Sequence, residues 1–396
     1  MAVVGIICEY NPFHLGHARQ FQLVRERFGP DTKIICLMSG NYVQRGAPAV
    51  FDKFVRSRAA VLCGASLVLE LPLTCALSSA EGFAQGGVGV MDRLGVVDKL
   101  CFGSEHGAVR ALQETARLLL APGFDDALRT TLQGGMSFAA ARAETVRRLG
   151  GDDTLLRQPN DILAVEYLKA IERLQSRLEP VSVLRQGSYH IQTPDPEQPS
   201  ATALRILLEQ DGAWEQYVPS AAARVFRGAA QYGFSYGERA VLARLRTLEE
   251  SDFQHLPYGA EGLWRKLQKA CRTQPSVEAI LRAVKSKRYA YSRLQRMLLC
   301  AFLGLTEAEL HKQPSYVRAL AFDAAGRGLL RRIRSEGCIP VINAGEVPED
   351  NAYYALERRA GDLFTLFAKE PSDTVCGLEA AGRIFYVKET EKTLAK

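Results

Sequence analysis

The sequence lacks a hydrophobic segment that could cross a membrane or act as a signal peptide. The most apolar stretch, 59–77, is interrupted by Glu70 and Pro72, whereas a membrane-spanning helix needs about 20 predominantly apolar residues. Near the N-terminus, Glu9 and Pro12 break the apolar run too early for a signal peptide. We therefore expect no membrane association.

Paired cysteines are also missing. The nine cysteines include no C-x-x-C pair, and their odd number and scattered positions argue against a disulfide framework or a zinc site. Cys8, Cys36 and Cys101 fall in apparent strands, where buried structural thiols are the default interpretation. A reducing cytoplasm is therefore the predicted compartment. The sequence also shows no carboxylate cluster dedicated to a metal ion, so we assign no metal-ligating residue.

Two motifs of acyl-transfer enzymes are absent as well. The chain contains no G-x-G loop of the acyl-CoA type and no covalent nucleophile motif. It has no internal repeat and no low-complexity segment. The hydrophobic content of 47% and the charged content of 24% are those of an ordinary globular protein.

The net charge is modest but unevenly distributed. The whole chain carries +6, while residues 261–334 hold 16 Lys or Arg against 5 Asp or Glu, a net charge of +11. The remainder of the chain therefore carries −5. One basic segment on an otherwise acidic chain predicts a polyanionic partner for that segment.

Short apolar runs alternate with helical segments in the first half of the chain. Its 396 residues are enough for two or three domains. Strands and helices alternating at these lengths predict an α/β fold, a Rossmann-like parallel sheet built of right-handed βαβ units. The expected strands are 3–8, 33–38, 67–71, 99–102 and 181–185.

Beyond about residue 215 the strand-like runs disappear and helical periodicity dominates. We therefore predict two domains, an α/β domain at 1–214 and a mainly α-helical domain at 215–396. The helices expected in the second domain are 236–248, 261–271, 277–284, 291–303, 315–333 and 350–367.

Two histidines stand at the first strand-to-helix turn. Val3 to Cys8 predicts a buried strand, and His14-Leu15-Gly16-His17 opens a helix that runs to about Arg27. A helix N-terminus offers unpaired N–H groups and a positive dipole end to phosphate, and a glycine there lets a nucleotide approach the backbone. His14 and His17 are thus candidate donors to a reacting α-phosphate. Two histidines near a turn are more often incidental or metal ligands, but this position favours a nucleotide.

A second phosphate cradle is predicted after the fifth strand. A polar loop is expected at 186–198, and Ser200-Ala201-Thr202-Ala203-Leu204-Arg205 then opens another helix. Hydroxyl groups at a helix start, with an arginine one turn later, can hold phosphate. Taken alone, a serine cap with a solvated arginine is the simpler interpretation. Asn160, similarly, could cap the helix at 160–174 or contact a ligand.

The basic segment is centred on 285–296, where cationic residues alternate with tyrosines. This composition suits RNA, because cations can contact the backbone while tyrosines stack on bases. A run of charges is more commonly just a solvated face. The candidate RNA-binding residues are Lys285, Lys287, Arg288, Tyr289, Tyr291, Arg293 and Arg296.

Several motifs together resemble known enzymes. The His14-x-Gly16-His17 turn resembles that of the HIGH-type nucleotidyltransferase superfamily. The combination of motifs is similar to the bacterial tRNA(Met) cytidine acetate ligase family and covers most of the chain. These motifs are Glu9-Tyr10-Asn11-Pro12-Phe13-His14, Met38-Ser39-Gly40-Asn41, Gln44-Arg45-Gly46, Glu70-Leu71-Pro72, Phe102-Gly103-Ser104-Glu105, Pro159-Asn160, Lys287-Arg288-Tyr289 and Gln295-Arg296.

The resemblance implies a reaction and a set of binding residues. ATP would activate acetate as acetyl-adenylate, and the acetyl group would pass to N4 of the wobble cytidine of elongator tRNA(Met). ATP would be a substrate, with Mg²⁺ on its phosphates, and the helical domain would bind the tRNA. His14 and His17 would be catalytic. The expected ATP contacts are Ile7, Cys8, Glu9, Tyr10, Asn11, Pro12, Phe13, His14, Leu15, Gly16, His17, Ala18, Arg19, Gln20, Gly103, Asn160, Arg185, Ser200, Thr202 and Arg205.

Two other functions remain open at this point. One is a small-molecule adenylyltransferase of the same superfamily, which the additional basic and aromatic helical segment argues against. The other is a non-enzymatic RNA-binding protein on a nucleotide fold, which the presence of both histidines and of Ser-x-Thr-x-x-Arg argues against. The sequence does not indicate an oligomeric state.

Overall fold

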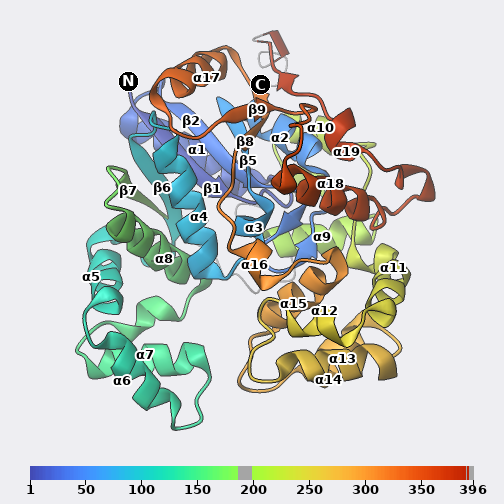
Figure 1. Cartoon of the computed structure of the whole chain (residues 1–396). Helices are drawn as coiled ribbons and strands as arrows, with labels where there is room; N and C mark the ends of the chain where they lie inside the picture. The colour runs from blue at the N-terminus through green and yellow to red at the C-terminus, as the bar shows by residue number, and fades with distance from the viewer. Residues whose placement is uncertain (186–198, 389, 392–396) are drawn as a thin grey trace.

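The computed structural model describes residues 1–185, 199–388 and 390–391. The polar loop expected at 186–198 lies outside the described residues. An eight-stranded sheet forms the centre of the molecule (Figure 1), with the strand order β10-β8-β5-β2-β1-β6-β7 and with β9 paired to β8. The α/β fold predicted from the sequence is confirmed.

All five predicted strands are present and run parallel to one another. They are β1 (Val3–Cys8), β2 (Lys33–Ser39), β5 (Leu67–Leu71), β6 (Lys99–Ser104) and β7 (Glu179–Leu184). A two-stranded hairpin, β3 (Tyr42–Val43) and β4 (Ala47–Pro48), follows β2. The connecting helices are α1 (Leu15–Phe28), α2 (Lys53–Leu62), α3 (Leu73–Ala76), α4 (Ala80–Arg93), α5 (Val109–Leu120), α6 (Phe124–Leu132), α7 (Phe138–Arg148), α8 (Pro159–Leu174) and α9 (Ala201–Glu209).

Helices cover both faces of the sheet. In β2, Ile35 and Leu37 pack into the same core as α4 and α8, while Ile34, Cys36 and Met38 pack into the core of α1 and α2. Side chains of a strand alternate between faces, so a strand buried on both sides reads as a continuous apolar run. This explains why the strands were visible in the sequence as unbroken apolar segments.

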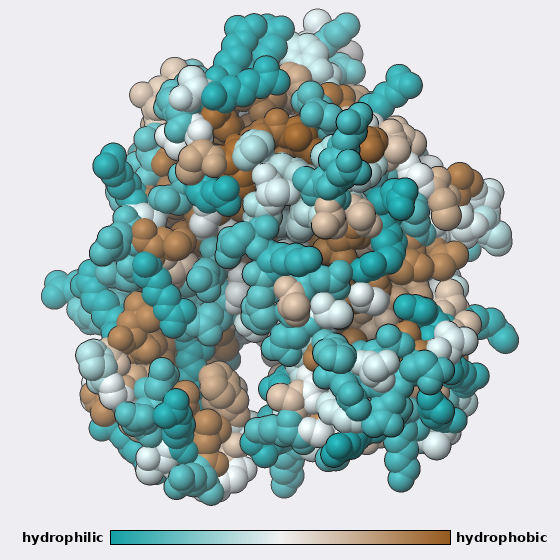
Figure 2. All heavy atoms as spheres, viewed as in Figure 1, coloured by the Kyte–Doolittle hydropathy of each residue, from teal (hydrophilic) through white to brown (hydrophobic). Residues whose placement is uncertain are grey.

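The helical part has its own core, which includes residues of the first half of the chain. It contains α11 (Phe234–Thr247), α13 (Leu263–Thr273), α14 (Val277–Val284), α15 (Tyr291–Leu303) and α18 (Ala352–Thr365). Tyr42 of the hairpin and Leu73 and Leu77 around α3 are buried in the same cluster. We call α11–α15, which include the short helix α12 (Glu250–Gln254), the helical lobe. It lies at the lower right in Figure 1, with α5–α7 at the lower left and a notch between them in Figure 2.

The last fifth of the chain, from Val317 onward, returns to the sheet, which differs from the prediction. The helix expected at 315–333 is wrong, because β8 (Val317–Phe322) precedes α17 (Ala324–Glu336), and β9 (Val341–Asn343) and β10 (Phe385–Tyr386) follow. A short apolar run fits a strand or a buried helix equally well. The open edge of β5 decides between them, because β8 pairs with it in antiparallel orientation. Residues 215–396 are therefore not a separate helical unit.

A buried ionic cluster joins this returning segment to the first half of the chain. The Lys53 ammonium donates to Glu70 at 2.7 Å and to Glu379 at 2.6 Å. Arg318 lies 3.4 Å from Glu357 and 3.8 Å from Glu70. Three carboxylates face two cations, so the cluster has an excess of one negative charge when every group is ionised. Burial, followed by the Glu70 charge, raises the pKa of Glu357 to about 7.

Within the part of the chain that the structure describes, no helix has both the length and the apolar character to span a membrane.

Candidate active site

A cleft of about 1450 Å³ opens at the carboxyl ends of β1, β6 and β7. Ligands of open α/β sheets bind at this edge. Residues from the first strand-to-helix turn, the ends of β6 and β7, and the starts of α8 and α9 form its wall. The cleft therefore lies where the sequence predicted the nucleotide site.

The two histidines cap α1 and fix each other. The Gly16 amide donates to His14 Nδ1 at 3.1 Å, and the His14 amide donates to His17 Nδ1 at 3.2 Å. The rings stack with their centroids 3.8 Å apart. Because both Nδ1 atoms accept a hydrogen bond, a neutral imidazole carries its proton on Nε2. Both rings are thereby arranged to donate through Nε2.

Burial keeps both imidazoles neutral. Desolvation, followed by the charges of Arg185 and Arg205, lowers the pKa of His14 to about 3. Desolvation and the neighbouring His14 also hold the pKa of His17 well below its ordinary value. At neutral pH the site therefore presents two uncharged N–H donors, and its positive charge comes from arginines.

Asn160 and Arg185 form one side of the cleft. Arg185 Nη1 donates to Asn160 Oδ1 at 3.1 Å, and the Asn160 amide nitrogen donates to Glu105. Glu105 also accepts from the Asp161 backbone N–H at 2.9 Å, so it satisfies the first turn of α8. Asn160 is not the helix cap, because α8 begins at Pro159. A Cβ at Gly103 would lie 2.6 Å from Arg185, so glycine is needed for this approach.

The second predicted cradle contacts the first. Ser200 caps α9 by accepting from the Ala203 N–H at 3.1 Å. Arg205 donates to the Thr202 hydroxyl at 3.1 Å and to the Asn11 carbonyl at 2.8 Å. The arginine is therefore held across the cleft between α9 and the β1–α1 turn, with its charge beside the histidines.

Most of the expected ATP-contacting residues line this one cleft. Pro12 and Phe13 do not line it, and Phe13 is buried against Tyr10 with ring centroids 4.9 Å apart. The residues that do line it are Ile7, Cys8, Glu9, Tyr10, Asn11, His14, Leu15, Gly16, His17, Ala18, Arg19, Gln20, Gly103, Asn160, Arg185, Ser200, Thr202 and Arg205.

The predicted RNA-binding residues do not line the cleft and divide by exposure into three groups. Lys285, Lys287 and Arg288 are exposed. Tyr291 and Arg293 are half-buried: the Tyr291 hydroxyl donates to Glu278 at 2.7 Å, and Arg293 donates to the Tyr258 carbonyl at 3.0 Å. Tyr289 and Arg296 are buried. The Tyr289 hydroxyl donates to Glu261 at 2.9 Å, while Arg296 donates to the Gln44 carbonyl at 3.1 Å. Arg296 thus joins two elements of the fold and is closed to a large ligand.

The sequence argument assigned no role to several residues that line the cleft. They include Glu105, Gln44, Arg45 and Gln295. Each stands in a short polar motif noted in the sequence, namely Gly103-Ser104-Glu105, Gln44-Arg45-Gly46 and Gln295-Arg296. The place of Gln295 beside the others was not predicted, because it comes from the distant helix α15, which only the tertiary fold brings to the cleft.

Comparisons with known proteins decide the family. A profile of the HIGH Nucleotidyl Transferase family matches residues 1–375. A tRNA(Met) cytidine acetate ligase of Acetivibrio thermocellus is 31% identical, covering 96% of this chain and 98% of that protein. One of Thermoanaerobacter sp. is 33% identical over the same shares. This chain belongs to the tRNA(Met) cytidine acetate ligase family.

Solved structures of this ligase family have the same fold. The apo form of Thermotoga maritima TmcAL matches with a TM-score of 0.90 at 28% identity, covering 98% of this chain and 100% of that one. The form of the same protein bound with alpha-thio ATP matches with a TM-score of 0.88. The family resemblance inferred from the motifs is confirmed.

Proposed function

We propose that this chain is an ATP-dependent ligase that acetylates N4 of the wobble cytidine of elongator tRNA(Met). Acetate attacks the α-phosphorus of ATP, and the bond to the β-phosphate breaks to release pyrophosphate. N4 of the cytidine then attacks the carbonyl carbon of acetyl-adenylate, N4 loses one proton, and AMP leaves. The names of the relatives and the ATP analogue bound by the Thermotoga maritima protein support this assignment.

The observation that carries the proposal is the capped histidine pair. Two neutral imidazoles with Nε2–H groups, held at the N-terminus of α1, suit a centre where negative charge moves from the α-phosphate to pyrophosphate. Arg205 and Arg185 supply positive charge on the adjoining side. Such a site accelerates the reaction by positioning and charge stabilisation, without a protein base.

Magnesium would enter with the nucleotide. Among the described residues, no group of three or more His, Cys, Asp or Glu side chains is arranged to hold a metal ion. Mg²⁺ keeps several waters and commonly binds through substrate phosphates. Mg²⁺ would therefore bind together with the ATP phosphates and would help to neutralise the charge of the pyrophosphate.

The remaining parts of the proposal concern the acceptor and the compartment. The exposed cations Lys285, Lys287 and Arg288 would contact the tRNA backbone, with the helical lobe as the main tRNA-binding region. A cytoplasmic location follows from the tRNA substrate.

The test uses purified protein, unmodified elongator tRNA(Met) and labelled acetate, with either ATP or acetyl-CoA added. We expect N4-acetylcytidine only with ATP, in an amount equal to the AMP released. Label transfer from acetyl-CoA without ATP, or the absence of label in cytidine, would overturn the proposal.

A further inference from the structure

The helical lobe reaches the catalytic cleft through a single side chain. Every lining residue in the described chain lies within 6–205 except Gln295, which stands in the second turn of α15. Gln295 is half-buried, and its carboxamide makes no hydrogen bond within the described residues. The Gln295 carboxamide is therefore available to hydrogen-bond a substrate that enters the cleft from the side of the helical lobe.

The backbone at Gln295 is fixed against the hairpin after β2. Gly46 has a φ of +79°, and a Cβ there would lie 2.5 Å from Arg296 N and 2.7 Å from the Gln295 carbonyl carbon. The hairpin and α15 therefore touch through their backbones, which only glycine allows at this position.

Arg296 and Glu9 complete this junction. Arg296 Nη1 donates to the Gln44 carbonyl at 3.1 Å, and its guanidinium lies 5.1 Å from the ring centroid of Tyr258. On the other side, the Gln44 N–H donates to Glu9 Oε1 at 2.7 Å. Gln44 is thus held by the helical lobe and by the β1–α1 turn together. These two hydrogen bonds, to Glu9 and from Arg296, consequently fix the position of Gln295 relative to the histidine turn.

The sheet order gives the cleft two ends. β1, which leads to the histidines, lies between β2 on one side and β6 and β7 on the other. Gly103 lies near the end of β6, Asn160 in the first turn of α8 and Arg185 just after β7, whereas the hairpin that contacts α15 follows β2. If ATP occupies the Asn160 end, then the second substrate approaches the α-phosphate from the hairpin end, beside Gln295.

We infer that Gln295 binds the target cytosine and orients its amino group toward the acyl carbon. This inference rests on the proposed function. A carboxamide offers one acceptor and a donor side by side, which match the N4–H donor and the N3 acceptor of cytosine. Oε1 of Gln295 accepts from one N4–H, and Nε2 donates to N3. The face of N4 is left open for attack on acetyl-adenylate.

Uracil presents O4 and N3–H, the reverse arrangement of acceptor and donor, so it can meet Gln295 only with the carboxamide turned over. Discrimination against uracil does not depend on this contact, because uracil has no amino group to acetylate. Gln295 has no ionisable group and does not remove the proton. Its contribution is to hold the base, with Arg296 as the positioning residue behind it.

The experiment separates the two half-reactions in Gln295→Ala. Acetate-dependent exchange of pyrophosphate into ATP, measured without tRNA, should stay within about twofold of wild type, because this half-reaction does not involve the base. Single-turnover transfer from acetyl-adenylate to saturating tRNA should fall roughly 10- to 100-fold, as expected for loss of a bidentate contact. The Kd for tRNA should change by less than about threefold, because backbone contacts dominate affinity.

Gln268→Ala is the matched control, since Gln268 is a half-buried glutamine of α13 that does not line the cleft. It should leave both half-reactions unchanged. A tRNA carrying 3-deazacytidine, which lacks N3, at the target position should slow transfer by the wild-type protein about tenfold. It should not slow Gln295→Ala further, because this variant has no carboxamide to donate to N3.

Wild-type transfer rates in Gln295→Ala, or an equal loss of pyrophosphate exchange, would overturn the assignment. An additive effect of 3-deazacytidine in the variant would also overturn it. Failure of the wild-type protein to acetylate cytidine would instead overturn the proposed function, so the two failures are distinguishable.

Discussion

The histidine turn and the basic segment differ in whether the residues that contact each other are close or distant in the sequence. At the turn, His14, Gly16 and His17 make their decisive contacts with each other, two or three residues apart along the chain. In the basic segment, Arg296 bonds to Gln44 and Tyr289 to Glu261, partners that are distant in sequence. A local motif can be read directly, whereas a charged run reveals neither which cations reach solvent nor which join elements of the fold.

Replacement of His17 should have the largest effect. His17→Gln can place an amide donor near the Nε2 position, while His17→Asn can keep the Nδ1-type acceptor for the His14 N–H but loses the donor. We expect His17→Asn to lower acetate-dependent pyrophosphate exchange by roughly 100- to 1000-fold, as for other lost charge-stabilising donors. His17→Gln should retain more activity than His17→Asn. The reverse order would show that capping of α1, and not donation to phosphate, limits the reaction.

Arg296→Ala should lower stability, in addition to its effect on the position of Gln295. Arg296 is 9% exposed, and its loss leaves the Gln44 carbonyl and the Tyr258 ring without a partner. We expect a fall of about 2–3 kcal/mol in the free energy of unfolding, measured by urea denaturation. Arg288→Ala, which removes an exposed arginine paired with an exposed Glu261, should cost less than about 1 kcal/mol. Equal losses of unfolding free energy in the two variants would show that Arg296 contributes no more to stability than the exposed Arg288.

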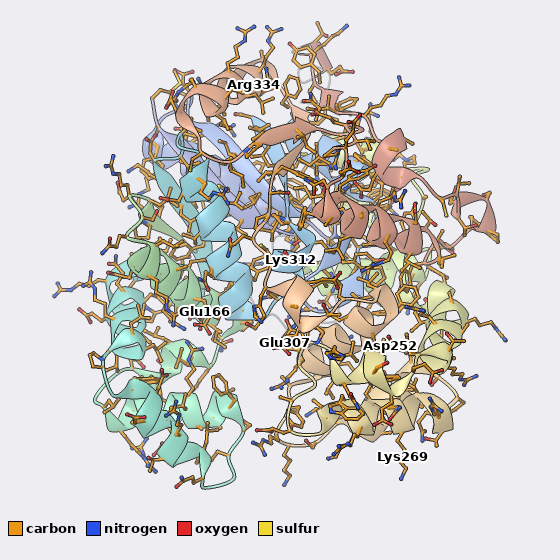
Figure 3. All side chains as sticks on the ribbon, viewed as in Figure 1. Glu166, Asp252, Lys269, Glu307, Lys312 and Arg334 are labelled. Carbon is orange, nitrogen blue, oxygen red and sulfur yellow. The ribbon has the colours of Figure 1, made fainter. Side chains whose placement is uncertain are left out.

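Charge reversal at Lys287 and Arg288 should act mainly on tRNA. Lys287→Glu with Arg288→Glu should weaken tRNA binding about tenfold and reduce the slope of log K against log salt by about two. The matched control is Arg331→Glu with Arg334→Glu on α17, which changes the net charge equally. Arg334 lies at the end of the molecule opposite the helical lobe (Figure 3). If the control weakens binding as much as the lobe variant, net charge and not the lobe surface determines affinity.

The smallest effect concerns Glu357 in the ionic cluster. Its pKa is raised in the folded protein to about 7, so the folded state binds more protons than the unfolded state between its ordinary pKa and that value. Stability from this group is present at low pH and is lost as the pH rises toward and through 7. Glu357→Gln, which imitates the protonated form, should lessen this loss by about 1 kcal/mol or more between about pH 5 and pH 8. Thermal unfolding at several pH values measures it, and an unchanged pH profile would contradict the assignment.

Much of the sheet and the geometry of the histidine turn could be predicted from the sequence. The five parallel strands are apolar runs bounded by turn residues, and their burial on both faces makes that pattern continuous. The grouping of Ser200, Thr202 and Arg205 could be predicted for the same reason, because these residues lie within two turns of one helix. These features depend on neighbours along the chain.

Only the tertiary structure decided the features that depend on distant partners. The segment 317–322 is apolar enough for a helix or a strand, and the free edge of β5 made it a strand. Gln295 and Arg296 are adjacent in sequence, yet one faces the cleft and the other is buried against the hairpin. The physical reason is that hydrophobic periodicity and local capping are encoded in neighbouring residues, whereas burial, pairing and the shape of a cleft arise when segments far apart come into contact.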